Sequence, residues 1–255
     1  MSFVNKLLAS VGIGNATVDT RIHRDKLVPG ENVEGVVHIR GGNVEQNIDG
    51  IYLKLYTTYI REMNDNKITA SAEIGRYQLT QSFVIQANEV KEIPFSFQLP
   101  YDTPITVGRT RVWVQTGLDI KSAVDPSDLD YIDVEPAPVV KALLQSISEL
   151  GFRLRNADCE EAKGRYRNRL PFIQEFEFLP TSGSFRQRLD ELEVVFLPDA
   201  QGAKVVLEVD RRARGFSGFL SEALDMDETI VTFHLTENDI PQCTQILQSQ
   251  IARYS

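Results

Sequence analysis

Residues 16 to 135 alternate between apolar and polar side chains with a period of two. The clearest runs are Val33-Gly35-Val37-Ile39, Ile51-Leu53-Leu55, Ile93-Phe95-Phe97-Leu99 and Val112-Val114. Successive side chains of a β-strand point to opposite faces, so the pattern predicts strands with one buried side and one solvent-facing side. Turn-forming pairs such as Pro29-Gly30 and Gly41-Gly42 separate the runs. About seven such strands in roughly 120 residues predict an antiparallel β-sandwich.

A proline pair marks the end of this pattern. The segment Glu135-Pro136-Ala137-Pro138 favours an extended connection, and a helical period follows it until Gly151, which is placed to end that helix. Alternating strands then resume, and a second amphipathic helix is predicted from Asp239 onwards. We therefore predict an all-β protein with two β-sandwich domains in tandem, residues 1–135 and 136–255, and short peripheral helices.

Composition narrows the class of protein. Of 255 residues, 42% are hydrophobic and 25% are charged, values that exclude global disorder. The net charge of −9 argues against general binding to nucleic acid or to an anionic membrane. Two cysteines, Cys159 and Cys243, are too few for a disulfide scaffold, and no apolar stretch approaches the ~20 residues of a membrane span. We predict a cytoplasmic protein with two free thiols, no membrane span and no cofactor.

The start of the sequence has helical rather than strand periodicity. Its apolar residues follow the spacing of one helix face: Phe3, Val4, Leu7, Leu8 and Val11. A helix of about ten residues is marginal alone in water, so we expect this stripe to dock on another surface. Its own sandwich, a second copy in a homodimer and a separate partner are the three alternatives. The stripe is the candidate interaction surface predicted from the sequence.

Three segments of the first half resemble arrestin-like domains. They are Val28-Pro29-Gly30-Glu31 with the strand that follows it, Pro94-Phe95-Ser96-Phe97 within residues 93–100, and the strand at residues 112–120. The proline and glycine of the first segment suit the two central positions of a type II turn. The resemblance implies that each half is an arrestin-like sandwich. The chain lacks the Pro-Pro-x-Tyr motif and the long acidic tail of eukaryotic arrestins, so receptor binding and tail release are not carried over.

Further segments are similar to the arrestin-like sporulation-control protein family of bacilli. They lie at residues 118–120, 123–128, 130–132, 142–144, 150–155, 176–178 and 210–215. This resemblance covers nearly the whole chain. It implies a regulator of sporulation initiation that acts as a scaffold through protein–protein interaction and has no catalytic activity. Sporulation signalling proteins and cell-division proteins are the partners that it suggests.

The sequence offers few candidates for catalytic or metal-binding residues. The sequence has no phosphate-binding glycine loop, no zinc-type cysteine pair and no nucleophile–base motif, so we predict that the protein is not an enzyme. His23 and His38 could meet across adjacent strands as metal ligands, although polar-face histidines are the simpler interpretation. One acidic cluster could bind calcium, or it could be a solvated loop with helix-capping carboxylates: Asp125, Asp128, Asp130 and Asp133.

A local positive charge offers a further candidate. Six cations lie close together in the sequence: Arg153, Arg155, Lys163, Arg165, Arg167 and Arg169. They could contact an acidic protein or a phosphate, or they could be charges that protect a strand edge. The alternative to a regulator is a small-ligand or metal-binding protein that uses an interdomain cleft.

Overall fold

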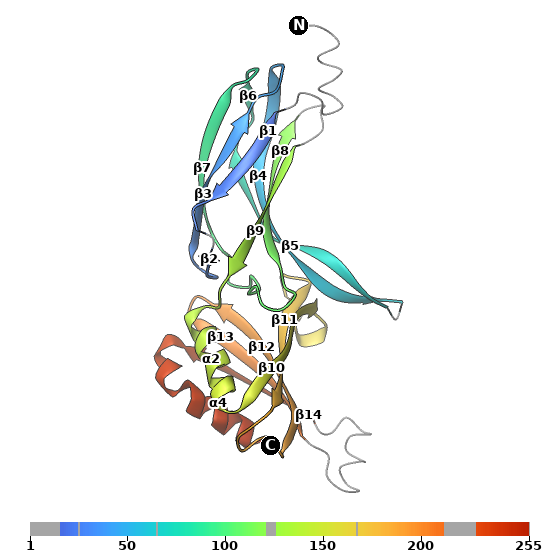
Figure 1. Cartoon of the computed structure of the whole chain (residues 1–255), viewed down its shortest axis with the longest axis vertical. Coiled ribbons are helices and arrows are strands. Elements are labelled where there is room, and N and C mark those ends of the chain that lie inside the picture. Colours follow the sequence, from blue (N-terminus) through green and yellow to red (C-terminus); the bar gives the residue numbers. More distant parts are fainter. Residues whose placement is uncertain are drawn as a thin grey trace. The chain divides into compact units, whose positions relative to one another are not determined.

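The computed structural model describes residues 16–24, 26–64, 66–120, 126–166, 168–211 and 228–254 (Figure 1). The strands of the first half are β1 (Thr17–Ile22), β2 (Lys26–Leu27), β3 (Asn32–Arg40), β4 (Gln46–Met63), β5 (Asn66–Thr80), β6 (Phe83–Ile85), β7 (Val90–Gln98), β8 (Val112–Ile120) and β9 (Ser127–Val134). The later elements are α2 (Pro138–Glu149), β10 (Phe152–Glu161), η1 (Gly164–Tyr166), β11 (Phe172–Pro180), β12 (Leu189–Asp199), β13 (Gly202–Arg211), β14 (Glu228–Thr236), η2 (Glu237–Gln242) and α4 (Cys243–Ala252).

The chain forms two compact units. The first takes the described residues of Met1–Thr58, Ser71–Thr103 and Arg111–Val134, and the second takes those of Tyr59–Ala70, Pro104–Thr110 and Glu135–Ser255. The second unit therefore contains two segments from the first half of the sequence. The boundary predicted at residues 135 and 136 stays a prediction, because compactness does not show whether either half folds alone.

The first unit contains a small antiparallel sheet with the strand order β1-β3-β7. Side chains of β3 alternate between buried and accessible positions, as the sequence pattern predicts. Pro94 lies in the outer strand β7, where a residue without an N–H is tolerated. The predicted turn before β3 is also present, because the Glu31 N–H donates to the Val28 carbonyl at 3.0 Å and Gly30 has a φ of +92°.

The remaining strands belong to a large mixed sheet with the order β14-β13-β12-β11-β10-β4-β8-β9-β2, in which β5 and β6 also pair with β4. Most of its ladders are antiparallel, but β10 pairs with β4 in parallel through Glu160 and Ile60, and β2 pairs with β9 in parallel. The mostly-β prediction is confirmed. The expectation of purely antiparallel sheets is wrong, because the second-half strand β10 continues a sheet that begins in the first half.

Two helices cover one face of the sheet in the second unit. Helix α2 contacts β10, β13 and α4, and its buried side chains include Leu143 and Ile147 (Figure 1). Gly151 lies just beyond this helix with a φ of +94°, and its N–H donates to the Ser148 carbonyl at 3.0 Å. This confirms the predicted stop signal. None of the helices that the structure describes is long and apolar enough to cross a membrane.

Candidate functional site

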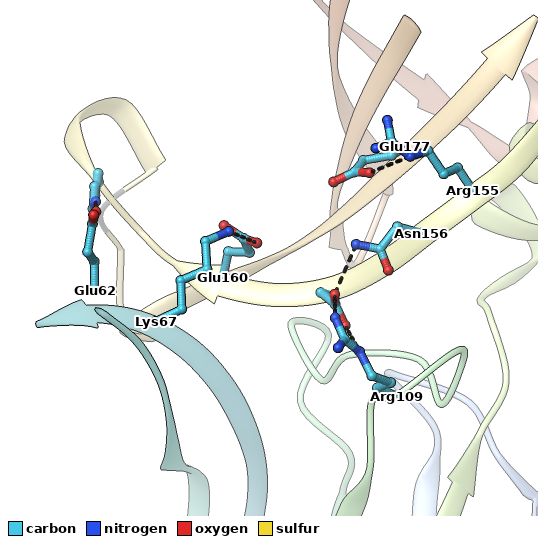
Figure 2. A network of polar contacts seen from close by, with 9 residues as sticks. Glu62, Lys67, Arg109, Arg155, Asn156, Glu160 and Glu177 are labelled. Carbon is cyan, nitrogen blue, oxygen red and sulfur yellow. Dashed lines mark hydrogen bonds and ion pairs between the residues drawn. The ribbon is translucent and has the colours of Figure 1, made fainter. Parts of the chain in front are cut away.

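Strand β10 of the second unit carries a network of charged side chains, which we call the β10 network (Figure 2). Figure 2 labels seven of its members: Glu62, Lys67, Arg109, Arg155, Asn156, Glu160 and Glu177. Asp158, Lys163 and Glu191 complete the network. Alternation along β10 places Asn156, Asp158 and Glu160 on one face. The network therefore joins residues 59–70 and 104–110 to the second half of the chain.

Asp158 is the buried centre of this network, with 6% of the residue exposed. It pairs with the Arg109 guanidinium and accepts a hydrogen bond from the Asn156 amide at 2.9 Å. Burial alone would raise the pKa of Asp158, but the hydrogen bonds from Arg109 and Asn156 outweigh it and hold this pKa below its ordinary value of 3.8. Asp158 is therefore a carboxylate at neutral pH.

Gln174 on β11 holds the segment that carries Arg109. Its side-chain oxygen accepts from the Ile105 N–H at 2.9 Å, and its amide nitrogen donates to the Ile105 carbonyl at 2.8 Å. The same nitrogen donates to the Thr110 hydroxyl at 3.2 Å. One side chain thus satisfies both backbone groups of a residue 69 positions away in the sequence. These bonds explain why a loop residue such as Arg109 has a defined partner.

The tip of the β4–β5 hairpin is held mainly by packing and only weakly by charge. The rings of Tyr59 and Phe172 stack with centroids 5.9 Å apart. Lys67 pairs with Glu160 at 3.7 Å, and Glu62 pairs with Lys163 at 3.3 Å. Three of these side chains are largely exposed, and that of Glu160 is 35% exposed. Exposed ion pairs contribute about 0–1 kcal/mol each, so the rings contribute more than the charges.

Replacing Asp158 with alanine is expected to lower the free energy of unfolding by about 1.5 kcal/mol, because the hydrogen bonds to a charged, buried group are lost. Its control is Glu160→Ala, two residues along the same face, where the loss should stay within about 0.5 kcal/mol. Urea unfolding at pH 7 measures both. Equal losses in the two variants would contradict the central position given to Asp158.

The structure shows two of the six sequence-predicted cations, Arg155 and Lys163, in ion pairs. Arg155 contacts Glu191 at 3.1 Å and Glu177 at 3.8 Å, and Lys163 pairs with Glu62. The side chains of Arg165 and Arg167 lie outside the described residues. Carboxylates of other strands therefore neutralise the charges of Arg155 and Lys163.

A row of glutamates crosses the same sheet and was not singled out in the sequence. Glu177, Glu193 and Glu208 are direct cross-strand partners on β11, β12 and β13, and Glu175 lies two residues from Glu177. Like charges directly opposite one another destabilise a sheet. The detectable signal was the repeated Glu-x-Glu spacing at 175/177 and 191/193, which places both carboxylates of each pair on one strand face.

Glu175 and Glu193 interact closely enough to share a proton. Burial, followed by the charge of Glu175, raises the pKa of Glu193 to about 8. Burial also raises the pKa of Glu175, while its hydrogen bond with Glu193 acts in the opposite direction. At neutral pH the pair therefore holds a proton that isolated carboxyl groups would release.

The aspartates weighed for calcium do not share one face. Asp128 and Asp130 point inward from β9, whereas Asp133 is on the opposite, exposed face and Asp125 lies outside the described residues. Asp128 accepts the Thr20 N–H of β1 at 2.7 Å, and burial followed by the charge of Asp128 raises the pKa of Asp130 to about 6. Within the described ranges, no three His, Cys, Asp or Glu side chains are arranged to hold a metal.

The described histidines and cysteines also lie apart from one another. His38 lies 3.3 Å from Glu92, and His234 lies 3.0 Å from Asp199. The His23 N–H donates to the Glu34 carbonyl, four residues along β3 from His38, so these two histidines do not pair across the strands as the metal hypothesis required. Both cysteines are buried free thiols. The apolar stripe of Phe3, Val4, Leu7, Leu8 and Val11 lies outside the described residues.

Comparisons with known proteins agree over nearly the entire chain. A family model described as SpoOM protein matches residues 4–213. The sporulation-control protein spo0M of Bacillus subtilis (strain 168) is 46% identical over 258 residues, covering 100% of both chains. The crystal structure of Spo0M from Bacillus subtilis superposes with a TM-score of 0.85 at 44% identity, covering 95% of this chain and 100% of the other. The chain therefore belongs to the Spo0M family of sporulation-control proteins.

Proposed function

We propose that the protein is a cytoplasmic, non-enzymatic regulator of sporulation initiation that acts by binding other proteins. The observation that carries the proposal is the 46% identity over the full length of both chains to a sporulation-control protein. The proposed architecture is a tandem of two arrestin-like sandwiches. A scaffold of this kind offers strand edges and sheet faces to partner proteins.

We assign the charged groups of the β10 network a structural rather than a catalytic role. Asp158 is held as a carboxylate by Arg109 and Asn156, and Arg155 is engaged by two glutamates. A general base needs a free lone pair directed at a substrate, and a nucleophile needs a base within hydrogen-bond reach. The side chains of the β10 network form their hydrogen bonds and ion pairs with one another, so we assign them to holding the unit together.

Complementation tests the regulatory role. The chain should restore the frequency of heat-resistant spores in a Bacillus subtilis strain that lacks its own Spo0M. Empty vector provides the lower reference and the resident protein the upper one. A folded, expressed chain that leaves spore frequency at the empty-vector level would contradict the proposal.

The predicted N-terminal stripe has its own test, in which Leu7 and Leu8 are both replaced with aspartate. Asn5→Asp with Ala9→Asp is the matched control, because helical spacing puts these residues on the opposite side. Lower thermal stability at unchanged mass indicates docking on the own chain, and a shift from dimer to monomer indicates a homomeric interface. Loss of complementation at unchanged stability and mass indicates a partner site. Wild-type values for all three would contradict any role for the stripe.

A metal- or ligand-binding protein is the competing class. Prolonged dialysis against a strong chelator should leave the thermal midpoint unchanged if no ion contributes to folding. A drop of several degrees that one specific ion reverses would favour the competing class over the regulator.

A further inference from the structure

The small sheet and the large sheet meet in the first unit along a seam, where β1 lies beside β8 and β9 (Figure 1). Thr20 of β1 makes two short hydrogen bonds across this seam. Its N–H donates to the Asp128 carboxylate at 2.7 Å, and its hydroxyl oxygen lies 2.6 Å from the buried hydroxyl oxygen of Thr116. A backbone N–H of one sheet is therefore satisfied by a side chain of the other sheet.

Asp130 lies two residues along β9 from Asp128, on the same inward face. The two carboxyl groups are hydrogen-bonded to each other. Among the described residues, the Oδ2 atom of Asp130 is buried and has no hydrogen-bond partner. A buried carboxylate oxygen without a donor is costly, whereas a neutral carboxyl group can donate its proton to a neighbouring carboxylate. The geometry therefore favours one proton shared by the two side chains.

The charged groups that act on Asp130 are acidic. Burial, followed by the charge of Asp128 and then that of Asp19 on β1, raises the pKa of Asp130 to about 6. Asp19 is itself paired with Arg21 at 3.1 Å. The other strands packed against β9 bring these residues: Val114 and Thr116 from β8, which do not ionise, and Lys26 from β2, which is in register with Asp133. A second negative charge at the seam is therefore poorly compensated.

We propose that Asp128 and Asp130 form a proton-dependent clasp between the two sheets, which is closed when the two side chains share a proton and loosens when both are ionised. In the closed state Asp130 donates to Asp128, and Asp128 holds the Thr20 N–H. In the loosened state two carboxylates face each other, and β1 is retained by its ladder with β3. The inference does not depend on the regulatory function.

The direction of the pH dependence follows from the two protonation states. The pKa of Asp130 rises from 3.8 to about 6 in the folded protein, so the clasp is fully closed below about pH 3.8 and loosens as pH rises through 6. A shift of about two units corresponds to about 100-fold, which partial exposure reduces to about tenfold. About fivefold of this falls between pH 4.5 and 7.5, and it should appear as lost protection of the β1 amides against hydrogen exchange.

Hydrogen exchange of the wild type and of Asp130→Asn, corrected for the intrinsic rate, tests the clasp. Asparagine donates an N–H at every pH, so β1 of the variant should keep its protection and exceed the wild type about fivefold at pH 7.5. Asp119→Asn changes an exposed carboxyl group of β8 and should leave the wild-type pH dependence unchanged. Amides of β8 report unfolding of the whole unit. Equal losses in β1 and β8, or an Asp130→Asn variant with the wild-type pH dependence, would overturn the proposal.

A titration of the wild-type protein followed by NMR gives a measurement that no substitution affects. The carboxyl carbon shift of Asp130 should change with a midpoint near pH 6. The amide proton of Thr20 should shift with the same midpoint, because its acceptor belongs to the pair. A midpoint near 3.8 for Asp130, or a Thr20 amide that does not respond, would show that no proton is shared at the seam.

Discussion

Replacing Gly151 with alanine is expected to lower the free energy of unfolding by about 3 kcal/mol. The residue has a φ of +94°, a conformation that costs an L-residue about 1 kcal/mol. A Cβ atom at this position would also lie 2.4 Å from the Ser182 carbonyl oxygen. The backbone of residues 181 and 182 cannot retreat freely, because both N–H groups donate to the Gly151 carbonyl. The clash therefore disturbs the end of α2 and the chain after β11 together.

Two causes contribute to this loss: the positive φ and the clash of the added Cβ atom with Ser182. Chemical denaturation of Gly151→Ala and, separately, of Gly164→Ala distinguishes them. Gly164 also has a positive φ, +53°, but an added Cβ atom meets nothing within 4 Å. The Gly164→Ala variant should lose only the part of the free energy of unfolding that comes from the backbone conformation, about 1 kcal/mol. Similar losses in both variants would mean that the contact with Ser182 relaxes at little cost.

Replacing Glu193 with glutamine is expected to stabilise the protein at alkaline pH by about 2 kcal/mol. Its pKa rises from 4.5 to about 8 in the folded protein, so the folded state binds more protons than the unfolded state between these values. Stability from this group is fully present below about pH 4.5 and is lost as pH rises towards 8. The full shift corresponds to about 4–5 kcal/mol, which partial exposure reduces by about half. Glutamine keeps the protonated shape without ionising.

The measurement is the thermal midpoint of wild type and variant from pH 4.5 to 8.5. The two curves should converge near pH 4.5 and separate as pH rises. Glu191→Gln is the matched control and should be destabilising, because Glu191 pairs with Arg155 at 3.1 Å. Parallel curves for wild type and Glu193→Gln would show that Glu193 is already ionised at neutral pH.

Local patterns predicted the parts of the fold that depend on local physics. The alternation around Val37 predicted a strand with one buried side, and Pro29-Gly30 predicted its preceding turn. Gly151 was expected to end a helix and is found just beyond α2. Each of these features is decided by backbone sterics within a few residues, which is why a single sequence reveals it.

Long-range placement was not predictable in the same way. Nothing near Arg109 in the sequence indicates that its partner is Asp158, 49 residues later, because exposed loop cations are common. Gln174 looked like an ordinary polar strand residue, yet it binds both backbone groups of Ile105. The glutamate row required knowledge of register: Glu177, Glu193 and Glu208 become neighbours only when three strands are aligned. The pairing of distant segments in the folded protein, and not local propensity, decides where such sites form.

The assignment of residues 59–70 and 104–110 to the second unit has a consequence for how the chain is made. A ribosome releases these segments well before β11. That strand begins about 60 residues after residue 110 and about 100 residues after residue 70, a stretch that takes roughly 3–20 s to synthesise. During that interval Tyr59 lacks the ring of Phe172 and Ile60 lacks its strand partner. These segments contain charged side chains, including Glu62, Lys67 and Arg109. Such side chains keep a segment hydrated until its partner strands have been synthesised. We therefore expect the residues that later form ion pairs to lower the tendency of the nascent chain to aggregate.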